Sequence, residues 1–298
     1  MSRPPPPSAA PAASVNERSS VVTAAGAPGF QISARPWPRV PLLNVWADDL
    51  TQAQLLDRLD AEGGLVFTIN PDHLYHLQNH AAFTAAYRQA DFITVDSHYV
   101  FSALRWQGHG VQEKITGSDL VPAYCRRHAS NPNVRIFLLG AMPGVAERAR
   151  QRLNATAGRE LVVGAHGPSM RFVDDDAEIA SVLAMIRDCG ATTLMVGLGA
   201  PKQEIWLARY RHQMPGVKVL MGVGATIDYE AGEVKRAPVW MRRLGLEWAY
   251  RVISEPRRYG MRYLRNARFL WWMAQARAGQ YQDPFPQAAP APRPGDPR

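Results

Sequence analysis

The stretch LMVGLGAPKQEIW, residues 194–206, contains the pattern that decides the fold. An apolar run rich in strand-favouring residues passes through two glycines and a proline into a polar, amphipathic segment. A buried strand, a tight turn and a helix form the repeating unit of a parallel sheet. The polar residues at this turn, Lys202, Gln203 and Glu204, either only start the helix or hold a ligand at the end of the strand.

The same alternation of apolar runs and helical patterns recurs along the chain. The expected buried strands are 65–70, 92–95, 134–140, 161–167, 192–199 and 217–224, and the expected helices include 144–155, 177–190 and 203–214. This order predicts an α/β fold with a Rossmann-like, mostly parallel sheet and helices on both faces. Ligands of such sheets bind at the carboxyl ends of the strands, so the candidate residues are sought there.

Composition divides the chain into four parts. Residues 1–38 and 281–298 are rich in Pro and Ala without apolar periodicity, and we expect disordered tails. Residues 39–235 carry the pattern of the Rossmann-like core, and 236–280 form a basic, amphipathic helical appendage. The chain has no secretory signal pattern, no apolar run of membrane-spanning length and no disulfide or metal spacing of its two cysteines. A cytoplasmic setting is therefore expected.

Polar side chains follow the first two strong strands. Thr68 and Asn70 flank the end of the first strand, and Asp96 ends the second. Asn70 and Asp96 can each be a helix N-cap, because a helical pattern follows both. A carboxylate at the rim of an apolar sheet is also a candidate general base, and His98 is a second candidate for proton transfer.

The strand ends later in the chain add further candidates. Gly199 permits a close approach of the backbone, and Lys202 supplies a cation. Gln203 offers both a donor and an acceptor, as a uracil edge or a sugar requires. Glu204 stands in a first helical turn, where the helix dipole favours an acid, so a structural role suffices for it. Asp228 follows the last strand, in a loop with charges of both signs.

Two motifs that point to cofactors are discounted. The segment IFLLGAMPGVAERA, residues 136–149, lacks the pattern G-x-G-x-x-G and the acid that binds a ribose, so an NAD site is poorly supported. Asp174 and Asp176 are similar to an Asp-x-Asp metal motif, but they stand just before a helix, where acids complement the dipole. We expect no metal and no cofactor.

The segment from Arg236 to Arg277 concentrates positive charge. Its ten arginines and two acids give an excess equal to the net charge of +8 of the whole chain. Four of the arginines recur at helical spacings: Arg251, Arg258, Arg262 and Arg265. A basic amphipathic helix that also bears Trp271 and Trp272 is typical of a segment at a membrane surface, and arginine is a bidentate partner of diphosphate. A solvated surface helix is the plainer interpretation.

Seven blocks of sequence resemble the WecG/TagA/CpsF glycosyltransferases, glycosyltransferase family 26. The blocks, in chain order, are TINPDH (68–73), ADFITVDSHYV (90–100), KITGSDL (114–120), IFLLGAMPGVAERA (136–149), GLGAPKQEIW (197–206), GVGATIDYEAGEVKRAP (222–238) and GLEWAYRVISEPRRYGMRYL (245–264). The resemblance extends over residues 40 to 273, and the three later blocks are the most specific.

The resemblance implies an inverting transferase that moves a sugar from a UDP-sugar to a polyprenyl-diphosphate-linked acceptor. It implies a Rossmann-like catalytic core, no metal, and an appendage that reaches the anionic surface of the inner face of the cell membrane. The reactions of the family build cell-envelope glycans and exopolysaccharides. Nucleic acid is not an expected partner, and neither the transferred sugar nor a homo-oligomer is decided by the sequence.

The resemblance also implies roles for particular residues. Thr68 and Asn70 line the sugar pocket, Asp96 is the catalytic base, and Gln203 lies near the donor. The catalytic cations of the appendage fall on Arg251, Arg258 and Arg262. Many relatives have Asp-Gly where this chain has Asp96 followed by Ser and His98, so both Asp96 and His98 are candidates for the base. Lys114 stands where relatives often carry arginine.

A rival interpretation is a non-catalytic adaptor that binds a membrane or nucleic acid through the basic segment. Such a protein would have no need of Asp96 or Gln203. A nucleotide-dependent oxidoreductase is disfavoured by the missing dinucleotide fingerprint.

Overall fold

The computed structural model describes residues 36–238, 240–241, 245–254 and 256–286. Residues 1–35 and 287–298, for which we predicted disorder, lie outside the described residues. Among the described residues, no helix has the length and apolar character needed to cross a membrane.

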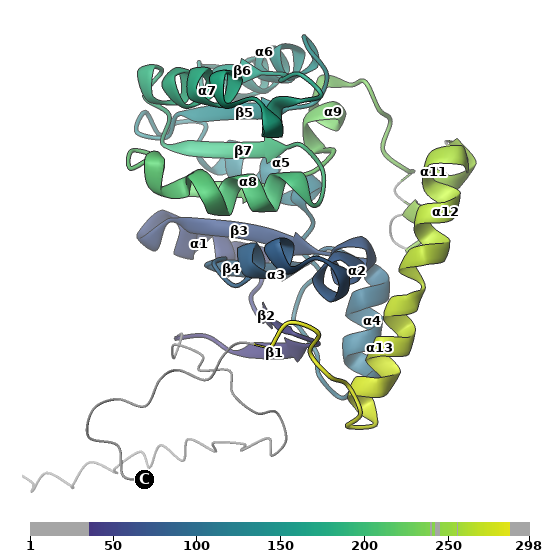
Figure 1. Ribbon diagram of the computed structural model, residues 1–298. Coiled ribbons are helices and arrows are strands. Elements are labelled where there is room, and N and C mark those ends of the chain that lie inside the picture. The colour runs from purple at the N-terminus through teal and green to yellow at the C-terminus, as the bar shows by residue number, and fades with distance from the viewer. Residues whose placement is uncertain (1–35, 239, 242–244, 255, 287–298) are drawn as a thin grey trace, which may run out of the picture. The chain divides into compact units, whose positions relative to one another are not determined.

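A six-stranded parallel sheet forms the centre of the molecule (Figure 1). Its order is β4-β3-β8-β7-β5-β6. The strands are β3 (Gly64–Ile69), β4 (Phe92–Val95), β5 (Ile136–Gly140), β6 (Val162–His166), β7 (Thr193–Gly197) and β8 (Val219–Gly222). Each coincides with one of the six expected apolar runs, so the predicted Rossmann-like sheet is confirmed.

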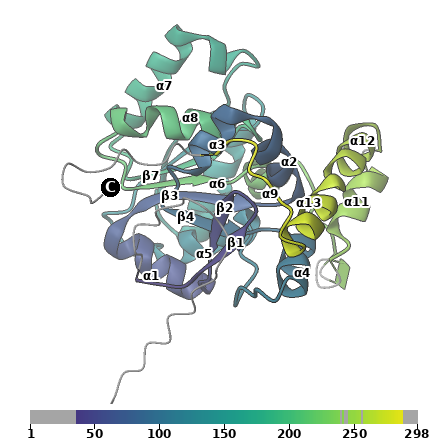
Figure 2. The ribbon, with the colours of Figure 1, turned by 60° about the horizontal axis from the view of Figure 1, so that its bottom comes forward.

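Helices cover both faces of this sheet, as predicted. On one face lie α3 (Ala81–Tyr87), α7 (Asp176–Asp188) and α8 (Lys202–Tyr210), and on the other lie α1 (Gln52–Glu62), α5 (Gly117–Arg127), α6 (Val145–Ala157) and α9 (Thr226–Ala231). Figure 2 shows α3, α7 and α8 on one side of the strands and α1 and α5 on the opposite side. Two short 3-10 turns, Phe172–Asp174 and Arg211–Gln213, complete this part.

Alternation along the strands divides the interior into two apolar clusters. In β7, Leu194 and Val196 face the cluster under α7 and α8, and Met195 faces the cluster under α5 and α6. In β3, Phe67 likewise faces the first of these clusters and Val66 faces the second. Parallel strands that are covered on both faces need apolar side chains at every position, which is why these strands read as unbroken apolar runs.

A hairpin that the sequence analysis did not predict covers the β4 edge of the sheet. It consists of β1 (Arg39–Leu42) and β2 (Val45–Asp48). The Asp48 carboxylate accepts a hydrogen bond from the backbone N–H of Ile93 at 2.6 Å. Trp37 stacks on Phe92 at 5.2 Å and donates to Asp48 at 2.8 Å. Trp37 therefore belongs to the core, although the predicted tail extended to residue 38.

The C-terminal helices stand at the edge of the sheet where the strands end (Figure 1). They are α11 (Glu247–Ser254), α12 (Pro256–Asn266) and α13 (Arg268–Arg277). The helices α12 and α13 pack on α2 (Pro71–Asn79), α11 packs on α12, and α13 lies beside α4 (His98–Trp106). Phe269, Trp272 and Met273 join the same apolar cluster as β3 and α2. The predicted helical appendage is thus present, and its last helix completes the core. The helix α12 begins at Pro256, and proline is well tolerated in the first turn of a helix.

Residues just after the appendage also contact the core. The Tyr281 hydroxyl donates to Gln78 at 2.7 Å, and Asp283 pairs with Arg88 at 3.1 Å. The predicted tail, which began at residue 281, therefore includes residues that pack against α2 and α3.

Candidate functional site

Thr68 and Asp96 meet at the carboxyl ends of two adjacent strands. Ile69 of β3 is aligned with Val95 of β4, which places the residues at these strand ends side by side. The backbone N–H of Asp96 donates to the Ile69 carbonyl at 2.9 Å, and the Thr68 hydroxyl donates to the Asp96 carboxylate at 3.3 Å. The structure therefore brings together two residues that lie 28 positions apart in sequence.

Asn70 and Asp96 differ in their use as helix caps. Asn70 is the N-cap of α2, and its side-chain oxygen accepts from the backbone N–H groups of Asp72 at 3.0 Å and His73 at 3.2 Å. The N-cap of α4 is Ser97, whose hydroxyl accepts from Tyr99 at 3.2 Å. The capping interpretation is confirmed for Asn70 and wrong for Asp96.

His98 is the first residue of α4 and is exposed. Its ring lies against Gly245, where an added Cβ would come within 2.7 Å of the imidazole. The second candidate base therefore faces the segment that leads into α11.

Gln203 lies inside the protein, with 2% of its surface exposed. Its amide nitrogen donates to Glu204 at 2.6 Å, and its oxygen accepts from the backbone N–H of Gly224 at 3.2 Å. Gln203 thus joins the start of α8 to the loop after β8. In this structure both the nitrogen and the oxygen of this amide have protein partners.

Glu204 and His73 face each other in the buried region beneath Thr68. Burial raises the pKa of Glu204 to about 7 and lowers the pKa of His73 to about 4. Between these values both side chains are neutral, so their 3.9 Å approach is not an ion pair. One Glu204 oxygen, Oε2, has no hydrogen-bond partner among the described residues.

The same buried region fixes the backbone of Thr68. Its carbonyl accepts from the Tyr87 hydroxyl at 2.6 Å and lies 2.5 Å from His73 Nδ1. His73 Nδ1 is also 2.9 Å from the Tyr87 hydroxyl. These contacts link α2 and α3 to the strand that carries Thr68.

The remaining predicted substrate-binding residues lie at the ends of β7 and β8. Gly199 and Lys202 are exposed there, and Gly199 has a φ of +76°. Asp228 lies in the first turn of α9 and is partly buried. The two strand ends approach closely, since a Cβ at Gly197 would lie 2.5 Å from the Gly224 carbonyl oxygen. The site therefore spans the carboxyl ends of β4, β3, β8 and β7.

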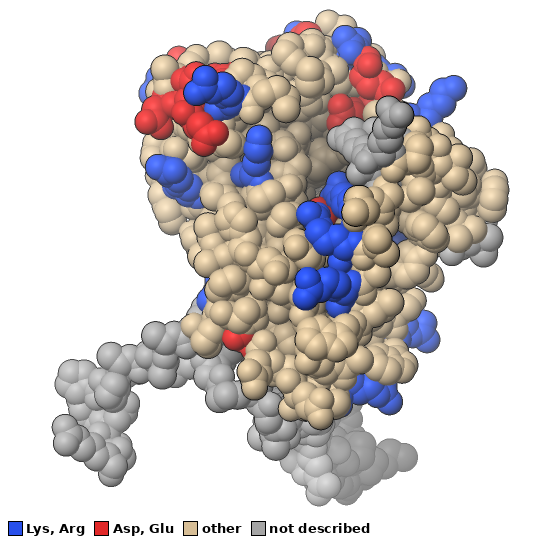
Figure 3. Space-filling view, turned by 45° about the vertical axis from the view of Figure 1, so that its right-hand side comes forward, with Lys and Arg blue, Asp and Glu red and all other residues tan. Residues whose placement is uncertain are grey.

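Basic side chains of α12 reach this edge of the sheet. Arg262 contacts Asp72 at 2.5 Å, and Arg265 contacts the other oxygen of the same carboxylate at 2.9 Å. Burial is the largest influence on the pKa of Asp72 and raises it, but the charge and hydrogen bond of Arg262, together with the nearby histidines, outweigh burial and hold that pKa below its usual value. Figure 3 shows Lys and Arg side chains gathered along the middle of this face. The side chains of Arg251 and Arg258 lie outside the described residues.

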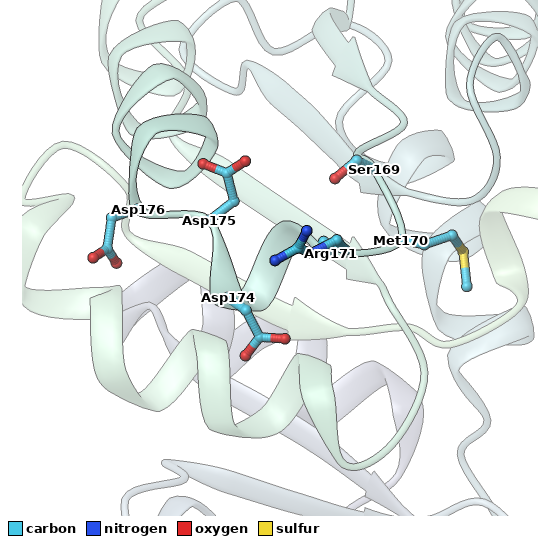
Figure 4. A pocket seen from close by; sticks show the side chains of 6 residues that line it. All are labelled: Ser169, Met170, Arg171, Asp174, Asp175 and Asp176. Carbon is cyan, nitrogen blue, oxygen red and sulfur yellow. The ribbon is translucent and has the colours of Figure 1, made fainter.

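The discounted acidic motif lies elsewhere. Asp174, Asp175 and Asp176 border a hollow of about 420 Å³ that follows β6, and β6 ends the sheet opposite β4. In Figure 4 the three carboxylates point in different directions. Asp175 is the N-cap of α7 and accepts from the backbone N–H of Glu178 at 3.0 Å. Within the part of the chain that the structure describes, no cluster of His, Cys, Asp or Glu could hold a metal.

Asp72 and His73 are parts of the site that sequence reasoning missed. An acid in the first turn of α2 is indistinguishable from one favoured by the helix dipole, and its arginine partner lies 190 residues away. His73 follows it without any motif of its own. Asp72 and His73 are recognised only from their contacts with Arg262 and Glu204, which lie far along the chain.

Comparison with known proteins shows the family of the chain. The model of the family described as "Glycosyl transferase WecG/TagA/CpsF family" matches residues 40–283. A protein of Staphylococcus aureus strain MRSA252, named N-acetylglucosaminyldiphosphoundecaprenol N-acetyl-beta-D-mannosaminyltransferase, is 29% identical over 229 residues, which are 74% of this chain and 87% of that protein. Proteins of the same name from strains MW2 and NCTC 8325 / PS 47 are 28% identical over the same shares. The chain belongs to the WecG/TagA/CpsF family of glycosyl transferases.

Proposed function

We propose that this protein is an inverting glycosyltransferase that moves a sugar from a UDP-sugar to a polyprenyl-diphosphate-linked saccharide. The observation that carries the proposal is the contact of Thr68 with Asp96 at the carboxyl edge of the sheet, where α/β proteins bind ligands. An arginine-bearing helix at the same edge supplies the charge that a diphosphate requires.

Asp96 acts as the general base in the proposed reaction. Its carboxylate accepts the proton of an acceptor hydroxyl while the hydroxyl oxygen attacks the anomeric carbon of the donor sugar. The bond from that carbon to the UDP oxygen breaks, and its electron pair leaves with UDP. Attack from the face opposite the leaving group inverts the anomeric configuration. Thr68 holds the carboxylate in place through its 3.3 Å hydrogen bond.

Departure of UDP leaves negative charge on a diphosphate, and a nearby cation lowers the cost of that charge. Arg262 is the member of the predicted catalytic arginines whose side chain the structure describes; Arg258 lies one helical turn before it in α12, and Arg251 lies in α11. Lys202 and Gly199, at the end of β7, complete the donor side of the proposed site.

The printed names of the relatives guide the choice of substrates. Those proteins transfer N-acetylmannosamine to N-acetylglucosaminyl-diphosphoundecaprenol. We infer the same class of acceptor for this chain, a saccharide on a polyprenyl diphosphate in cell-envelope or exopolysaccharide synthesis. N-acetylmannosamine is the first donor sugar to test, with glucose and a uronic acid as the alternatives.

We infer that the protein is peripheral on the inner face of the cell membrane, where a polyprenyl-linked acceptor would be available. Met261, Leu264, Leu270 and Trp271 on α12 and α13 are exposed apolar side chains. Arginines on the same helices would attract anionic lipid, and the apolar side chains would enter the interface.

Turnover of purified protein with a panel of UDP-sugars and a short-chain polyprenyl-diphosphate saccharide, in detergent, tests the proposal. We expect UDP release with one donor and a lipid product heavier by one sugar residue in mass spectrometry. Absence of both with every donor, from protein that still binds UDP in a thermal-shift assay, would argue against transfer. Absence of UDP binding as well would favour the adaptor interpretation.

A further inference from the structure

We infer that Asp72 is a positioning residue that holds Arg262 and Arg265 as a two-arginine site for a diphosphate group. This inference rests on the proposed function, because a diphosphate is present in both the UDP-sugar and the lipid-linked acceptor. It extends that function to two residues, Asp72 and Arg265, that the family resemblance leaves without a role.

The carboxylate of Asp72 is placed to organise both arginines at once. It is 6% exposed and follows the Asn70 cap by two residues, so the start of α2 fixes its position. Each of its oxygens accepts from one guanidinium, at 2.5 Å for Arg262 and 2.9 Å for Arg265. A buried carboxylate with two arginine partners fixes the planes of both guanidinium groups.

The arginines retain donors for a ligand. Each contacts Asp72 through a single nitrogen, and their side chains are 38% and 42% exposed. No other hydrogen bond of either guanidinium occurs within the described residues. The Arg265 guanidinium also stacks on the Tyr75 ring at 4.4 Å, which restricts its rotation.

The charge of the cluster suits an anion. Two guanidinium groups and one carboxylate give a net positive charge. His76 lies 3.8 Å from Asp72, but burial lowers the pKa of His76, which disfavours a further charge there. The cluster lies just past the end of β3, the strand that carries Thr68. A diphosphate bound by the free N–H groups would therefore lie beside the proposed catalytic base.

A purely structural clasp is the competing explanation, and affinity separates the two. If Asp72 only clasps α12 to α2, replacing it by Asn should leave the affinity for a diphosphate unchanged, or raise that affinity because a nearby negative charge is lost. Loss of positioning predicts weaker binding, because the arginines would have to be ordered by the ligand itself. The two explanations thus predict different affinities of Asp72→Asn for a diphosphate: weaker binding if Asp72 positions the arginines, and equal or tighter binding if it does not.

Calorimetric titration of the full chain with UDP, and separately with farnesyl diphosphate, provides the test. In Asp72→Asn we expect affinity for one of these probes to fall at least about tenfold, and the affected probe identifies whether donor or acceptor occupies the site. Asp283→Asn is the matched control. It removes the contact of Asp283 with Arg88, which also docks C-terminal residues on the core, and should leave both affinities within about twofold.

Equal or tighter binding of both probes by a folded Asp72→Asn protein would overturn the inference while the proposed function stands. If that variant does not fold, Arg265→Lys serves instead, since it keeps the charge and loses the planar geometry. Affinity for UDP and farnesyl diphosphate that is unchanged in Arg265→Lys would equally overturn it. Wild-type protein that binds neither probe would overturn the proposed function together with this inference.

Discussion

The hydroxyl of Thr68 and the carboxylate of Asp96 meet across β3 and β4, where the hydroxyl donates a hydrogen bond to that carboxylate. In Thr68→Val the shape is kept and the donor is lost. A hydrogen bond to a charged group is worth about 1.5–3 kcal/mol, so we expect turnover to fall roughly 10- to 100-fold. Thr68→Ser should recover most of the rate. Steady-state UDP release measures both variants, and equal rates for Thr68→Val and wild type would exclude this contact from the reaction.

Glu204 contributes a pH dependence of stability that has a definite sign. Its pKa in the folded protein is about 7, above the ordinary value of 4.5, because burial disfavours the charged form. Its stabilising contribution is therefore complete below pH 4.5 and is lost as the pH rises through about 7. Over that window the change amounts to at most roughly 3 kcal/mol.

The variant Glu204→Gln should remove this dependence, since glutamine keeps the acceptor for Gln203 and cannot ionise. We expect its stability relative to wild type to increase between pH 5 and pH 8, as read from urea unfolding at the two values. The low pKa of His73 makes stability fall as the pH drops from about 6.5 toward 4, but both proteins carry His73, so this contribution cancels in the difference between them. A constant difference between the two proteins across this range would show that Glu204 is ionised in the fold.

At the scale of elements, α13 has one face in the core and one face outside. Trp272 is 7% exposed and packs near Tyr75, whereas its neighbour Trp271 is 57% exposed. Trp272→Ala should cost about 3–5 kcal/mol of unfolding free energy, and Trp271→Ala should change it by less than about 0.5 kcal/mol. Denaturant unfolding of the two variants tests this contrast. Similar costs for both would mean that α13 does not pack as described.

The strands and most helices of the core could be predicted because each follows from a local pattern. Buried parallel strands need unbroken apolar runs, and β3 to β8 all have them. The hairpin β1–β2 was missed because its short strands alternate weakly and are stabilised by Asp48, which bonds to Ile93 far along the chain.

The residues of the candidate site also fall into those that the sequence predicts and those that it does not. Thr68 and Asp96 could be located because they lie at the ends of two apolar runs, and parallel strands bring their carboxyl ends together. The environment of Gln203 and the partners of Asp72 could not be predicted from the sequence, because they depend on helices that meet only in the folded chain. The paired tryptophans looked like one exposed patch in the sequence, yet helical geometry places Trp272 inward and Trp271 outward.

At the scale of the whole molecule, the net charge of +8 and the exposed apolar residues of α12 and α13 should act together at a membrane. We expect the protein to sediment with vesicles that contain anionic lipid and to be largely released at about 1 M salt, where charges are screened beyond roughly 3 Å. Trp271→Ala, which leaves the core intact, should lower the bound fraction. Equal binding to neutral and anionic vesicles would contradict the charge-based attachment.

The general base of the transfer is the point at which fold, site and proposed reaction meet. The most direct measurement compares wild type, Asp96→Asn and His98→Ala in turnover of a UDP-sugar with a polyprenyl-diphosphate saccharide, alongside UDP affinity. Since a general base contributes about 10²- to 10⁴-fold, Asp96→Asn should lose at least about 10²-fold in turnover and keep UDP affinity, and His98→Ala should stay active. Full turnover in Asp96→Asn, with loss in His98→Ala, would contradict the assignment and move the base to α4.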